Sequence, residues 1–450
     1  MSNDPEQEYF SDGVAEEILN SLSNLKDLKV AGRTSSFQFK GKNIDLREIG
    51  EKLDVSTVLE GSVRKQGNFL RVTVQLINVD DGFHLWSEKY DRNMDDIFAI
   101  QDEIALSITE KLKVTLLEKD REMITKSYTQ NTEAYELYLK GRFYMNRRGA
   151  SIMIGIQCFQ QAINIDPGFA LAHVGYADAN LLIGFYALLP PAQVMQKAKQ
   201  SAKTAIRLDP FLCEPYCSLG FYYTCFEWNW AEAEKNFLKS IELNPRYAQA
   251  HYWYGFLLLA WVKGEFDRAE KQGQAAIKLE PLSAICYGVY GGILHSAGKY
   301  KEAIEACKSG IELDPNSFLC QVYVANAYFV LQRYEEAIVA YEYSMKISNR
   351  HQFPLSGLIY TYWKMGNQDK VYELMNELKE KSLKEFVASV FIAMSVAHLD
   401  NLDEAFEYLE KAYNERDPLI LTLQYGPWVP EALKNDPRFQ KLLNRIGFTK

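Results

Sequence analysis

The residues from Leu282 to Pro315 form a unit that repeats at once along the chain. The unit has the pattern of a helix, a short turn at 297–300, a second helix and an Asp-Pro stop. The same 34-residue spacing continues from Pro315 to about Asn349. Self-similarity at this period is typical of a solenoid of helical hairpins, in which each hairpin buries its apolar face against its neighbours.

Small residues recur where the two helices of a unit must approach each other. Gly291 in the first helix precedes Ala303 in the second by twelve residues. Three more pairs keep this pattern, namely Gly255 with Ala269, Gly220 with Ala233, and Ala325 with Ala337. Units close on prolines, which cannot continue a helix, at Pro167, Pro210, Pro245, Pro281 and Pro315. Because the pairs and prolines stay in phase, a helical bundle with chance prolines is the weaker interpretation.

These residues resemble the tetratricopeptide repeat, which has a small residue in its first helix, an alanine in its second and a terminal proline. The resemblance implies an array of about eight units over residues 126–418. The second unit is stretched by a loop at 187–191, and the seventh has Ile359 and Val371 in place of the small pair. Residues 419–450 are expected to form a capping region whose last helix begins at Asp436-Pro437.

Residues 1–125 do not follow the repeat. Leu70 to Ile77 alternates apolar and polar residues with a period of two, between hairpin signals at Gly67-Asn68 and Asp81-Gly82. With its neighbours at 57–64 and 84–90, this segment predicts a three-stranded antiparallel meander. The remaining pattern predicts helices over 14–25 and 45–53, a short strand over 28–31, and a long helix from Ile97.

Three motifs carry a second resemblance: Asp4 to Gly13, Leu59 to Arg64, and Tyr90-Asp91-Arg92. They are similar to the TolB-like amino-terminal domain, an α/β module that precedes tetratricopeptide arrays in bacterial signalling proteins. The segment from Ile97 to Ile104 matches the last helix of that domain. The family usually opens on an apolar strand before the Asp-Pro segment, so we expect this chain to be a fragment or its sheet to lack the first strand.

The two resemblances together predict an α+β N-terminal domain over 1–125, followed by an all-α tetratricopeptide-repeat superhelix. No linker rich in Gly, Pro or Ser separates Leu117 from Tyr135. We therefore expect the long helix from Ile97 to dock rigidly on the first hairpin. The alternative is a hinge at 125–131, where the composition is polar.

Charge and composition narrow the kinds of partner. Residues 1–125 carry 16 Lys and Arg against 24 Asp and Glu, whereas residues 126–450 carry 34 against 35. Nucleic-acid binding needs clustered positive charge, so we expect no nucleic-acid partner. No apolar run is long enough for membrane insertion, and the start lacks a signal-peptide pattern. The seven cysteines favour a reducing cytoplasm, or the periplasm if the parent protein is membrane-anchored.

The sequence holds no recognisable catalytic constellation. It lacks a phosphate loop, a His-Glu-x-x-His motif and a Gly-x-Ser-x-Gly motif. The six histidines are far apart, and His173 and His251 fall at positions where repeat helices pack. We therefore expect no catalytic residue, no metal site and no cofactor site, and we interpret the chain as a non-enzyme.

The first helices of tetratricopeptide units line a concave wall at set positions. Counting from Cys213, Ala248, Ala284, Phe318 and Gln352 predicts a partner-binding groove of Phe221, Tyr252, Phe256, Leu259, His295, Asn326, Phe329, Phe353, Tyr360 and Trp363. This wall is aromatic and weakly charged, so it favours a protein or peptide with an apolar or helical segment. Alternatively, these side chains cover one another or pack against the chain's own terminal helix.

The sequence therefore indicates a non-catalytic segment for protein interaction and sensing in a bacterial signalling protein. The TolB-like resemblance implies a parent of the nucleotide cyclase type or a winged-helix transcription regulator of the CadC type, with the output domain upstream. A free-standing tetratricopeptide scaffold protein is the first alternative. An enzyme whose site has no familiar motif is the second.

Overall fold

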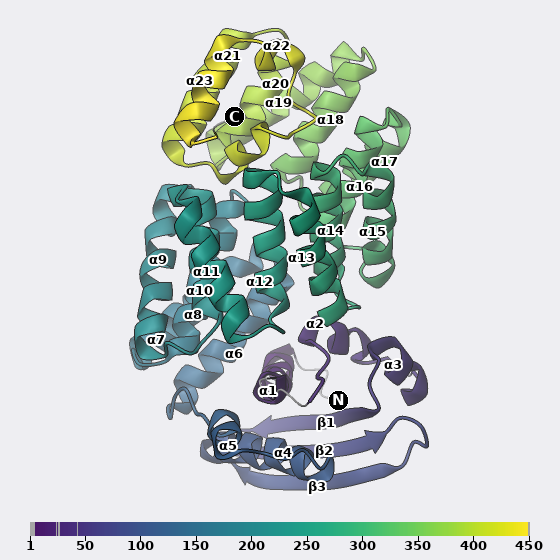
Figure 1. Ribbon diagram of the computed structural model, residues 1–450, viewed down its shortest axis with the longest axis vertical. Helices are drawn as coiled ribbons and strands as arrows, with labels where there is room; N and C mark the ends of the chain where they lie inside the picture. Colours follow the sequence, from purple (N-terminus) through teal and green to yellow (C-terminus); the bar gives the residue numbers. More distant parts are fainter. Residues whose placement is uncertain (1–4, 24, 26–27, 43, 449–450) are drawn as a thin grey trace. The chain divides into compact units, whose positions relative to one another are not determined.

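The computed structural model describes residues 5–23, 25, 28–42 and 44–448 (Figure 1). Internal contacts divide the chain into two compact units. Unit 1 comprises Met1–Ala179, Thr204–Phe211 and Leu279–Leu282, and unit 2 comprises Asn180–Lys203, Leu212–Lys278 and Ser283–Lys450. Among the described residues, no helix combines the length and apolar character needed to cross a bilayer.

Unit 1 contains the predicted three-stranded meander. The strands β1 (Thr57–Gln66), β2 (Phe69–Asn78) and β3 (His84–Asn93) pair antiparallel in the order β1-β2-β3. Leu70, Val72 and Val74 on β2 are buried, whereas Arg71 and Thr73 between them are only partly buried. This alternation places one face of β2 in the core and the other toward water, as a half-buried strand requires.

Helices cover the apolar face of this sheet. α1 (Pro5–Ser23) contacts β1, and α4 (Ile97–Lys111) contacts β2 and β3. The isoleucines of α4 at 97, 100, 104 and 108 are almost completely buried, as the predicted apolar stripe requires. The shorter elements are α2 (Arg33–Ser36), η1 (Phe37–Phe39), α3 (Leu46–Leu53), η2 (Met94–Asp96) and α5 (Glu118–Ile124). Asp45 caps α3 by accepting a 2.8 Å hydrogen bond from the Arg47 amide.

Two local predictions for unit 1 are wrong. The first helix begins at Pro5, not at Val14, and continues through Gly13; Asp4 of the quoted motif lies outside the described residues. A Cβ on Gly13 would stand 2.7 Å from Leu139 Cδ2, so this glycine permits a close helix crossing and does not begin a helix. Residues 28–31 form no strand, because the ladders of the described sheet join only β1, β2 and β3.

The predicted docking of the long helix on the first hairpin is present within unit 1. Phe98 of α4 packs on Tyr135 of α6 with ring centroids 4.9 Å apart, and Gln101 Nε2 donates to the Tyr135 hydroxyl at 2.6 Å. The segment that follows α5 is also held, because Lys126 Nζ contacts Asp209 Oδ2 at 2.6 Å. These contacts favour a docked junction over the alternative of a free hinge at 125–131.

A buried carboxylate joins three helices of unit 1. The Glu16 side chain of α1 is 4% exposed and lies between Arg142 of α6 and Arg33 of α2, with Arg33 Nε 2.7 Å from Glu16 Oε2. Burial opposes ionisation of Glu16, but the charges of Arg142 and Arg33 outweigh it and lower its pKa. Removing either arginine would leave an undercompensated buried charge.

Eight helical hairpins follow along the described chain. Those of repeats 3 to 6 stand side by side in Figure 1. In order, the helices are α6 (Thr132–Arg147) with α7 (Ser151–Ile165), α8 (Ala170–Phe185) with α9 (Pro191–Leu208), α10 (Glu214–Tyr222) with α11 (Trp230–Leu243), α12 (Ala248–Trp253) with α13 (Phe266–Leu279), α14 (Ala284–Ser296) with α15 (Tyr300–Leu313), α16 (Phe318–Val330) with α17 (Tyr334–Ile347), α18 (Gln352–Lys364) with α19 (Gln368–Lys384), and α20 (Ser389–Ala397) with α21 (Leu402–Glu415).

The chain ends with three short helices in unit 2. They are η5 (Pro418–Leu423), α22 (Glu431–Lys434) and α23 (Pro437–Ile446). Asp436 caps α23 as predicted, accepting a 2.9 Å hydrogen bond from the Arg438 amide. Two arginines of this helix pair with acidic residues of α21, because Arg438 contacts Asp403 at 2.7 Å and Arg445 contacts Glu410 at 2.5 Å.

The small residues lie where the hairpin helices approach most closely. A Cβ on Gly291 would stand 3.4 Å from the Ala303 carbonyl oxygen and would overlap Cys307 Sγ. A Cβ on Gly255 would stand 3.0 Å from the Ala269 carbonyl oxygen. Gly220 differs from the prediction, because its nearest neighbour is the Phe237 ring and not Ala233. All seven cysteines are buried and unbridged, consistent with their interpretation as small core residues.

Four of the five proline stops share one hydrogen-bonding pattern. The Asp or Asn before the proline accepts a bond from the amide two residues on, as in Asp314 to Asn316 at 2.9 Å and Asn244 to Arg246 at 2.9 Å. At three of these stops, the side chain six residues after the proline bonds to the proline carbonyl. His173, His251 and Gln321 do so at 3.1, 2.9 and 3.0 Å, which confirms the packing role expected for both histidines.

The first helices of repeats 3 and 4 depart from regular α-helical geometry. The proline spacing is 35 residues from Pro210 to Pro245 and 36 from Pro245 to Pro281, against 34 in the next unit. The first helices of these two units end in the π-helical turns η3 (Tyr223–Glu227) and η4 (Tyr254–Lys263). A π turn holds more residues than an α turn, so the extra residues are absorbed inside the helices.

The helix contact at Ala303 generates the first prediction. Ala303→Leu places three more carbon atoms where the side chain is fully buried, so we expect a loss of about 1–3 kcal/mol in the free energy of unfolding. Urea unfolding measures this loss. Lys301→Leu, on the exposed face of the same helix, is the control and should change stability little. Equal unfolding curves for Ala303→Leu and the parent would contradict the assigned register.

A second prediction concerns Glu17, which accepts hydrogen bonds from Tyr138 at 3.4 Å and Asn20 at 3.3 Å. Burial, together with the neighbouring Glu16 charge, raises the Glu17 pKa to about 7. The folded chain then keeps a proton that the unfolded chain releases near pH 4.5, so this group's contribution to stability falls as pH rises from about 4.5 to 7.

Glu17→Gln should therefore be more stable than the parent at pH 8 and nearly equal to it at pH 4. Urea unfolding at both pH values measures the difference. Glu110→Gln, an exposed change on α4, is the control and should follow the parent at each pH. An unchanged pH dependence in Glu17→Gln would show that Glu17 titrates normally.

Candidate functional site

The predicted wall residues converge on one cavity in unit 2. Its volume is about 70 Å³. Six of the ten predicted side chains line it, from η4, α14, α16 and α18: Phe256, His295, Asn326, Phe329, Phe353 and Tyr360. The repeat register brings them together because first helices of successive units stand side by side and present equivalent positions to one surface.

The other four predicted residues lie elsewhere in unit 2. Phe221 packs in the core, edge-on to Trp253 with ring centroids 4.9 Å apart. Leu259 is fully buried within η4, and the Tyr252 hydroxyl donates to Gln249 Oε1 at 3.3 Å. Trp363 is half-buried and packs on the His398 ring at 4.7 Å. The predicted wall residues that line the cavity therefore come from repeats 4 to 7 and not from repeat 3.

A segment near the C-terminus closes one side of the cavity. Leu419 and Thr422 of η5 line it together with Pro427 and Trp428. Two contacts hold this segment: Trp428 O lies 3.1 Å from His398 Nε2, and Asp417 accepts a 3.2 Å hydrogen bond from the Val390 amide. Part of the aromatic wall is therefore covered by the chain itself, whereas Asn326, Phe353 and Trp363 remain half-buried.

The cavity is uncharged. Among the residues the structure describes, no Asp, Glu, Lys or Arg lines it. Burial lowers the His295 pKa to about 4, so its imidazole is neutral near pH 7. The Tyr341 hydroxyl donates to Asn326 Oδ1 at 2.5 Å, which uses one acceptor position of that amide oxygen. The site therefore discriminates by shape and hydrogen bonding and not by charge.

Several lining residues were missed in the sequence. Phe185 and Tyr186 come from the end of α8 and the loop after it, and Trp261 comes from η4. The loop is anchored on α18, because the Tyr186 carbonyl oxygen lies 2.8 Å from His351 Nε2 and Gln352 donates to the Ala187 carbonyl at 3.2 Å. The long spacing of the second repeat predicted a loop here, but the repeat register assigns no position to residues outside the helices.

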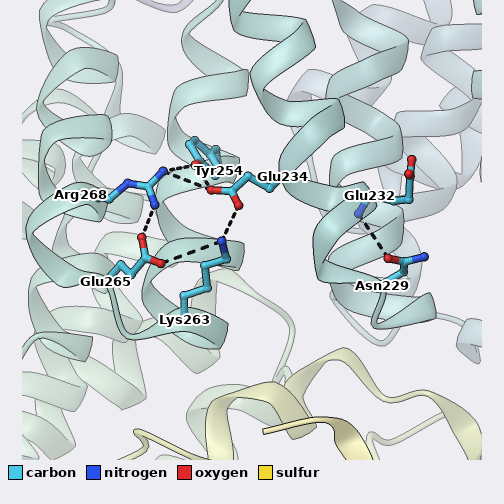
Figure 2. Close-up of polar contacts among 7 residues, drawn as sticks. All are labelled: Asn229, Glu232, Glu234, Tyr254, Lys263, Glu265 and Arg268. Atoms are coloured by element: carbon cyan, nitrogen blue, oxygen red, sulfur yellow. Dashed lines mark hydrogen bonds and ion pairs between the residues drawn. The ribbon is translucent and has the colours of Figure 1, made fainter. Parts of the chain in front are cut away.

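The strongest polar cluster of unit 2 joins repeats 3 and 4 (Figure 2). Glu234 accepts a hydrogen bond from the Tyr254 hydroxyl at 2.7 Å and pairs with Lys263 and Arg268, while Arg268 also contacts Glu265. Burial opposes ionisation of Glu234, but the hydrogen bonds from Lys263 and Tyr254 outweigh it and lower the pKa to about 2. The cluster is an ion-pair network between helices, and no group of metal-ligand residues occurs in the described chain.

Comparison with known sequences agrees with this geometry. Residues 236–271 and 256–318 each match a sequence model described as tetratricopeptide repeat. Together with the paired helices and their phased prolines, these matches define the helical hairpins of this chain as tetratricopeptide repeats. The fold class is accordingly an α+β N-terminal part followed by an all-α tetratricopeptide array. Repeats of this class are protein-interaction scaffolds and are generally non-catalytic.

One curated relative is "Putative adenylate cyclase 3" of Rhizobium meliloti strain 1021, 42% identical over 174 residues. The match covers 38% of this chain and 30% of the relative, so the chain spans less than a third of that protein. Among solved structures, a thermophilic TPR protein of Thermus thermophilus is 20% identical with a TM-score of 0.38, covering 44% of this chain and 99% of that one. An IFIT1 monomeric mutant with Gppp-AAAA is 14% identical with a TM-score of 0.44, covering 71% and 88%.

The ion-pair network generates a third prediction. Glu234→Gln removes the charge that Lys263 and Arg268 share, and the Glu234 side chain is one-quarter exposed, so we expect a loss on the order of 1–2 kcal/mol at pH 7. Because the folded pKa lies below the unfolded value, this stabilisation is present above about pH 4.5 and disappears as pH falls toward 2.

Urea unfolding of Glu234→Gln and the parent at pH 7 and pH 3 measures the effect, with Glu242→Gln on the exposed face of α11 as control. The gap between Glu234→Gln and the parent should narrow at pH 3. A gap of the same size at both pH values would mean that the lost stability is not electrostatic.

Proposed function

We propose that this chain is the non-catalytic interaction and sensing segment of a bacterial signalling protein. In this proposal residues 1–125 are a TolB-like α/β module, residues 126–418 the tetratricopeptide array and residues 419–450 its cap. The array recruits a protein partner through an apolar or helical segment of that partner. The observation that carries the proposal is the convergence of six wall side chains from four repeats on one uncharged aromatic surface.

The accessible part of that surface is its half-buried edge. Asn326 and Phe353 line the cavity and are partly exposed, whereas Phe256 and Phe329 are buried. Trp363, a predicted wall residue that does not line the cavity, is also partly exposed. A partner's apolar anchor would contact Phe353 and Trp363 first and exclude water from them, which is where interface energy concentrates. Asn326 supplies an amide that fixes the register of the partner's backbone.

The parent protein is proposed to be a nucleotide cyclase. The support is the name of the R. meliloti relative and the 42% identity of the matched segment. A winged-helix transcription regulator is the second kind of parent, and a free-standing scaffold protein is the alternative without an output domain. Reading the gene upstream of the codon for Met1 discriminates among them, since a cyclase, a winged-helix or no output domain would be encoded there.

A fourth prediction tests the partner surface. A photo-crosslinking residue in place of Met365, next to the half-buried edge, should trap the partner from cells of the source organism, and mass spectrometry identifies it. With the purified partner, Phe353→Ala should weaken binding at least tenfold, because truncating a central aromatic anchor commonly costs about 2 kcal/mol or more. Tyr372→Ala, on the exposed face of α19, should leave binding unchanged.

The salt dependence provides an independent readout. An apolar interface predicts a Kd that changes only slightly between low and high salt, because little charge is involved. Tight, salt-sensitive binding of a peptide that ends in acidic residues would contradict the proposal. So would equal partner capture by Trp363→Ala, Phe353→Ala and the parent chain.

A further inference from the structure

We propose that strand β3 of unit 1 is an interface for a second copy of this chain, which pairs its own β3 antiparallel across a two-fold axis at Tyr90. The two three-stranded sheets thereby become one continuous sheet. The inference goes beyond the proposed recruitment of a protein partner, because it concerns unit 1 and none of the residues that line the cavity of unit 2.

β3 is a border strand of the sheet. Among the described residues the ladders join β3 to β2 alone, and Figure 1 shows β3 at the border of the meander. Along the strand Tyr90 is buried and Trp86 is partly buried, whereas the side chains at the other positions are exposed. A border strand presents a row of amide and carbonyl groups that can pair with a strand from another chain.

The hydrogen-bond pattern of the sheet identifies which backbone groups point outward. The Met94 amide, immediately beyond the end of β3, donates to the Asn68 carbonyl at 2.9 Å. Hydrogen-bonded and non-hydrogen-bonded pairs alternate along an antiparallel ladder, so Tyr90 bonds to β2, whereas Lys89 and Asp91 direct their amides and carbonyls away from it. Lys89 and Asp91 can therefore exchange backbone hydrogen bonds with an added strand.

The charges of β3 make the strand complementary to itself. Glu88, Lys89, Asp91 and Arg92 surround Tyr90 with alternating signs. When two copies run antiparallel with Tyr90 opposite Tyr90, Lys89 of each copy faces Asp91 of the other. Glu88 and Arg92 face each other in the same way. Opposite charges directly across a ladder stabilise the pairing, and a two-fold interface requires this kind of self-complementarity.

The same charges exclude the neighbouring registers. In a continuous two-fold sheet, opposite residues point to the same face, so the axis passes between one residue and its own copy. If the axis moves from Tyr90 to Glu88, Lys89, Asp91 or Arg92, that charged side chain faces its own copy, which is destabilising. Charged residues commonly protect border strands against uncontrolled pairing. In β3 they also leave one register open to a second copy.

Contacts within unit 1 are compatible with this pairing. On the outer face of the sheet, Arg71 Nε lies 2.6 Å from Asp91 Oδ1, and Lys89 Nζ lies 2.9 Å from Asp91 Oδ2. On the inner face, Arg92 contacts Glu103 of α4 at 3.4 Å. All of these ion pairs are exposed, so exchanging a partner within the chain for one on the second copy costs little.

Sedimentation velocity of the full-length chain measures the self-association. Pairing of two short strands buries a small interface, so we expect a reversible dimer with a Kd on the order of 10–100 µM. Lys89→Glu sets two carboxylates opposite each other at two places in the dimer, and Asp91→Lys does the same with two ammonium groups. Each variant alone should dimerise roughly tenfold more weakly than the parent.

An equimolar mixture of Lys89→Glu and Asp91→Lys provides the decisive measurement. In the mixed dimer the two introduced charges face each other with opposite signs, and the native Asp91 of one chain faces the native Lys89 of the other. The mixture should therefore dimerise within about twofold of the parent. Mixing cannot rescue a misfolded variant, so this result separates an intermolecular contact from damage to the fold. Glu88→Lys with Arg92→Glu is a second such pair if either variant fails to fold.

Glu60→Lys is the matched control, because Glu60 is exposed on β1, the opposite border of the sheet. This variant should dimerise like the parent. Amide hydrogen exchange gives an independent readout. The amides of Lys89 and Asp91 should gain protection as the protein concentration rises, whereas the Tyr90 amide, which bonds to β2, should be protected at every concentration.

Four results would overturn the inference. The first is a monomer at every concentration up to about 300 µM. The second is equal dimerisation of Lys89→Glu, Asp91→Lys and the parent. The third is a mixture that dimerises as weakly as its components although thermal unfolding shows both to be folded. The fourth is loss of dimerisation in Glu60→Lys, which would place the interface on β1. These variants lie in unit 1, so failure of this inference would not affect the partner surface proposed in unit 2.

Discussion

The structure depends on helix crossings that leave no room for a side chain. A Cβ on Gly141 would stand 2.6 Å from the Phe159 ring, and one on Gly220 would stand 2.7 Å from the Phe237 ring. Because interiors are packed as densely as crystals, such a crossing sets the distance and angle between two helices. That geometry then determines which positions of the next hairpin come into contact with it. The effect of a single small residue per helix therefore extends along the array.

The repeat register alone does not determine the shape of the wall that the first helices form. Repeats 3 and 4, which contain additional residues, keep phase with their neighbours because η3 and η4 accommodate these residues as π-helical turns. In repeat 4, the π-helical segment η4 supplies Phe256 and Trp261 to the cavity. Together with the loop after α8 and the C-terminal segment at 417–428, it encloses a space that regular repeats would leave as an open groove.

Unit 1 adds a buried electrostatic contact to this packing. Glu16 is held between Arg33 and Arg142, and the adjacent Glu17 is partly buried beside the Glu16 charge, which raises the energy of its own charged form. One carboxylate is thereby stabilised as an ion and the next is driven toward its neutral form. The difference arises from the positions of the two arginines, because burial acts on both groups in the same direction.

The sequence by itself determined the features that repeat or alternate locally. The meander, the capped helices at Asp45 and Asp436, the hairpin array and its packing histidines all follow from residue spacing, because a helix or strand is specified by neighbours within a few residues. The strand predicted over residues 28–31 is absent, because a strand forms only where another strand provides hydrogen-bonding partners for its backbone. Six of ten wall residues could be placed together because they share one register.

Only the tertiary structure decided what encloses that wall. Tyr186 and Trp428 reach the cavity from a loop and from the C-terminal segment, neither of which has a place in the repeat register, and Trp261 reaches it from the π-helical segment η4. Periodicity tells which face a residue occupies, whereas burial and hydrogen bonding depend on every segment that the completed fold brings to that face.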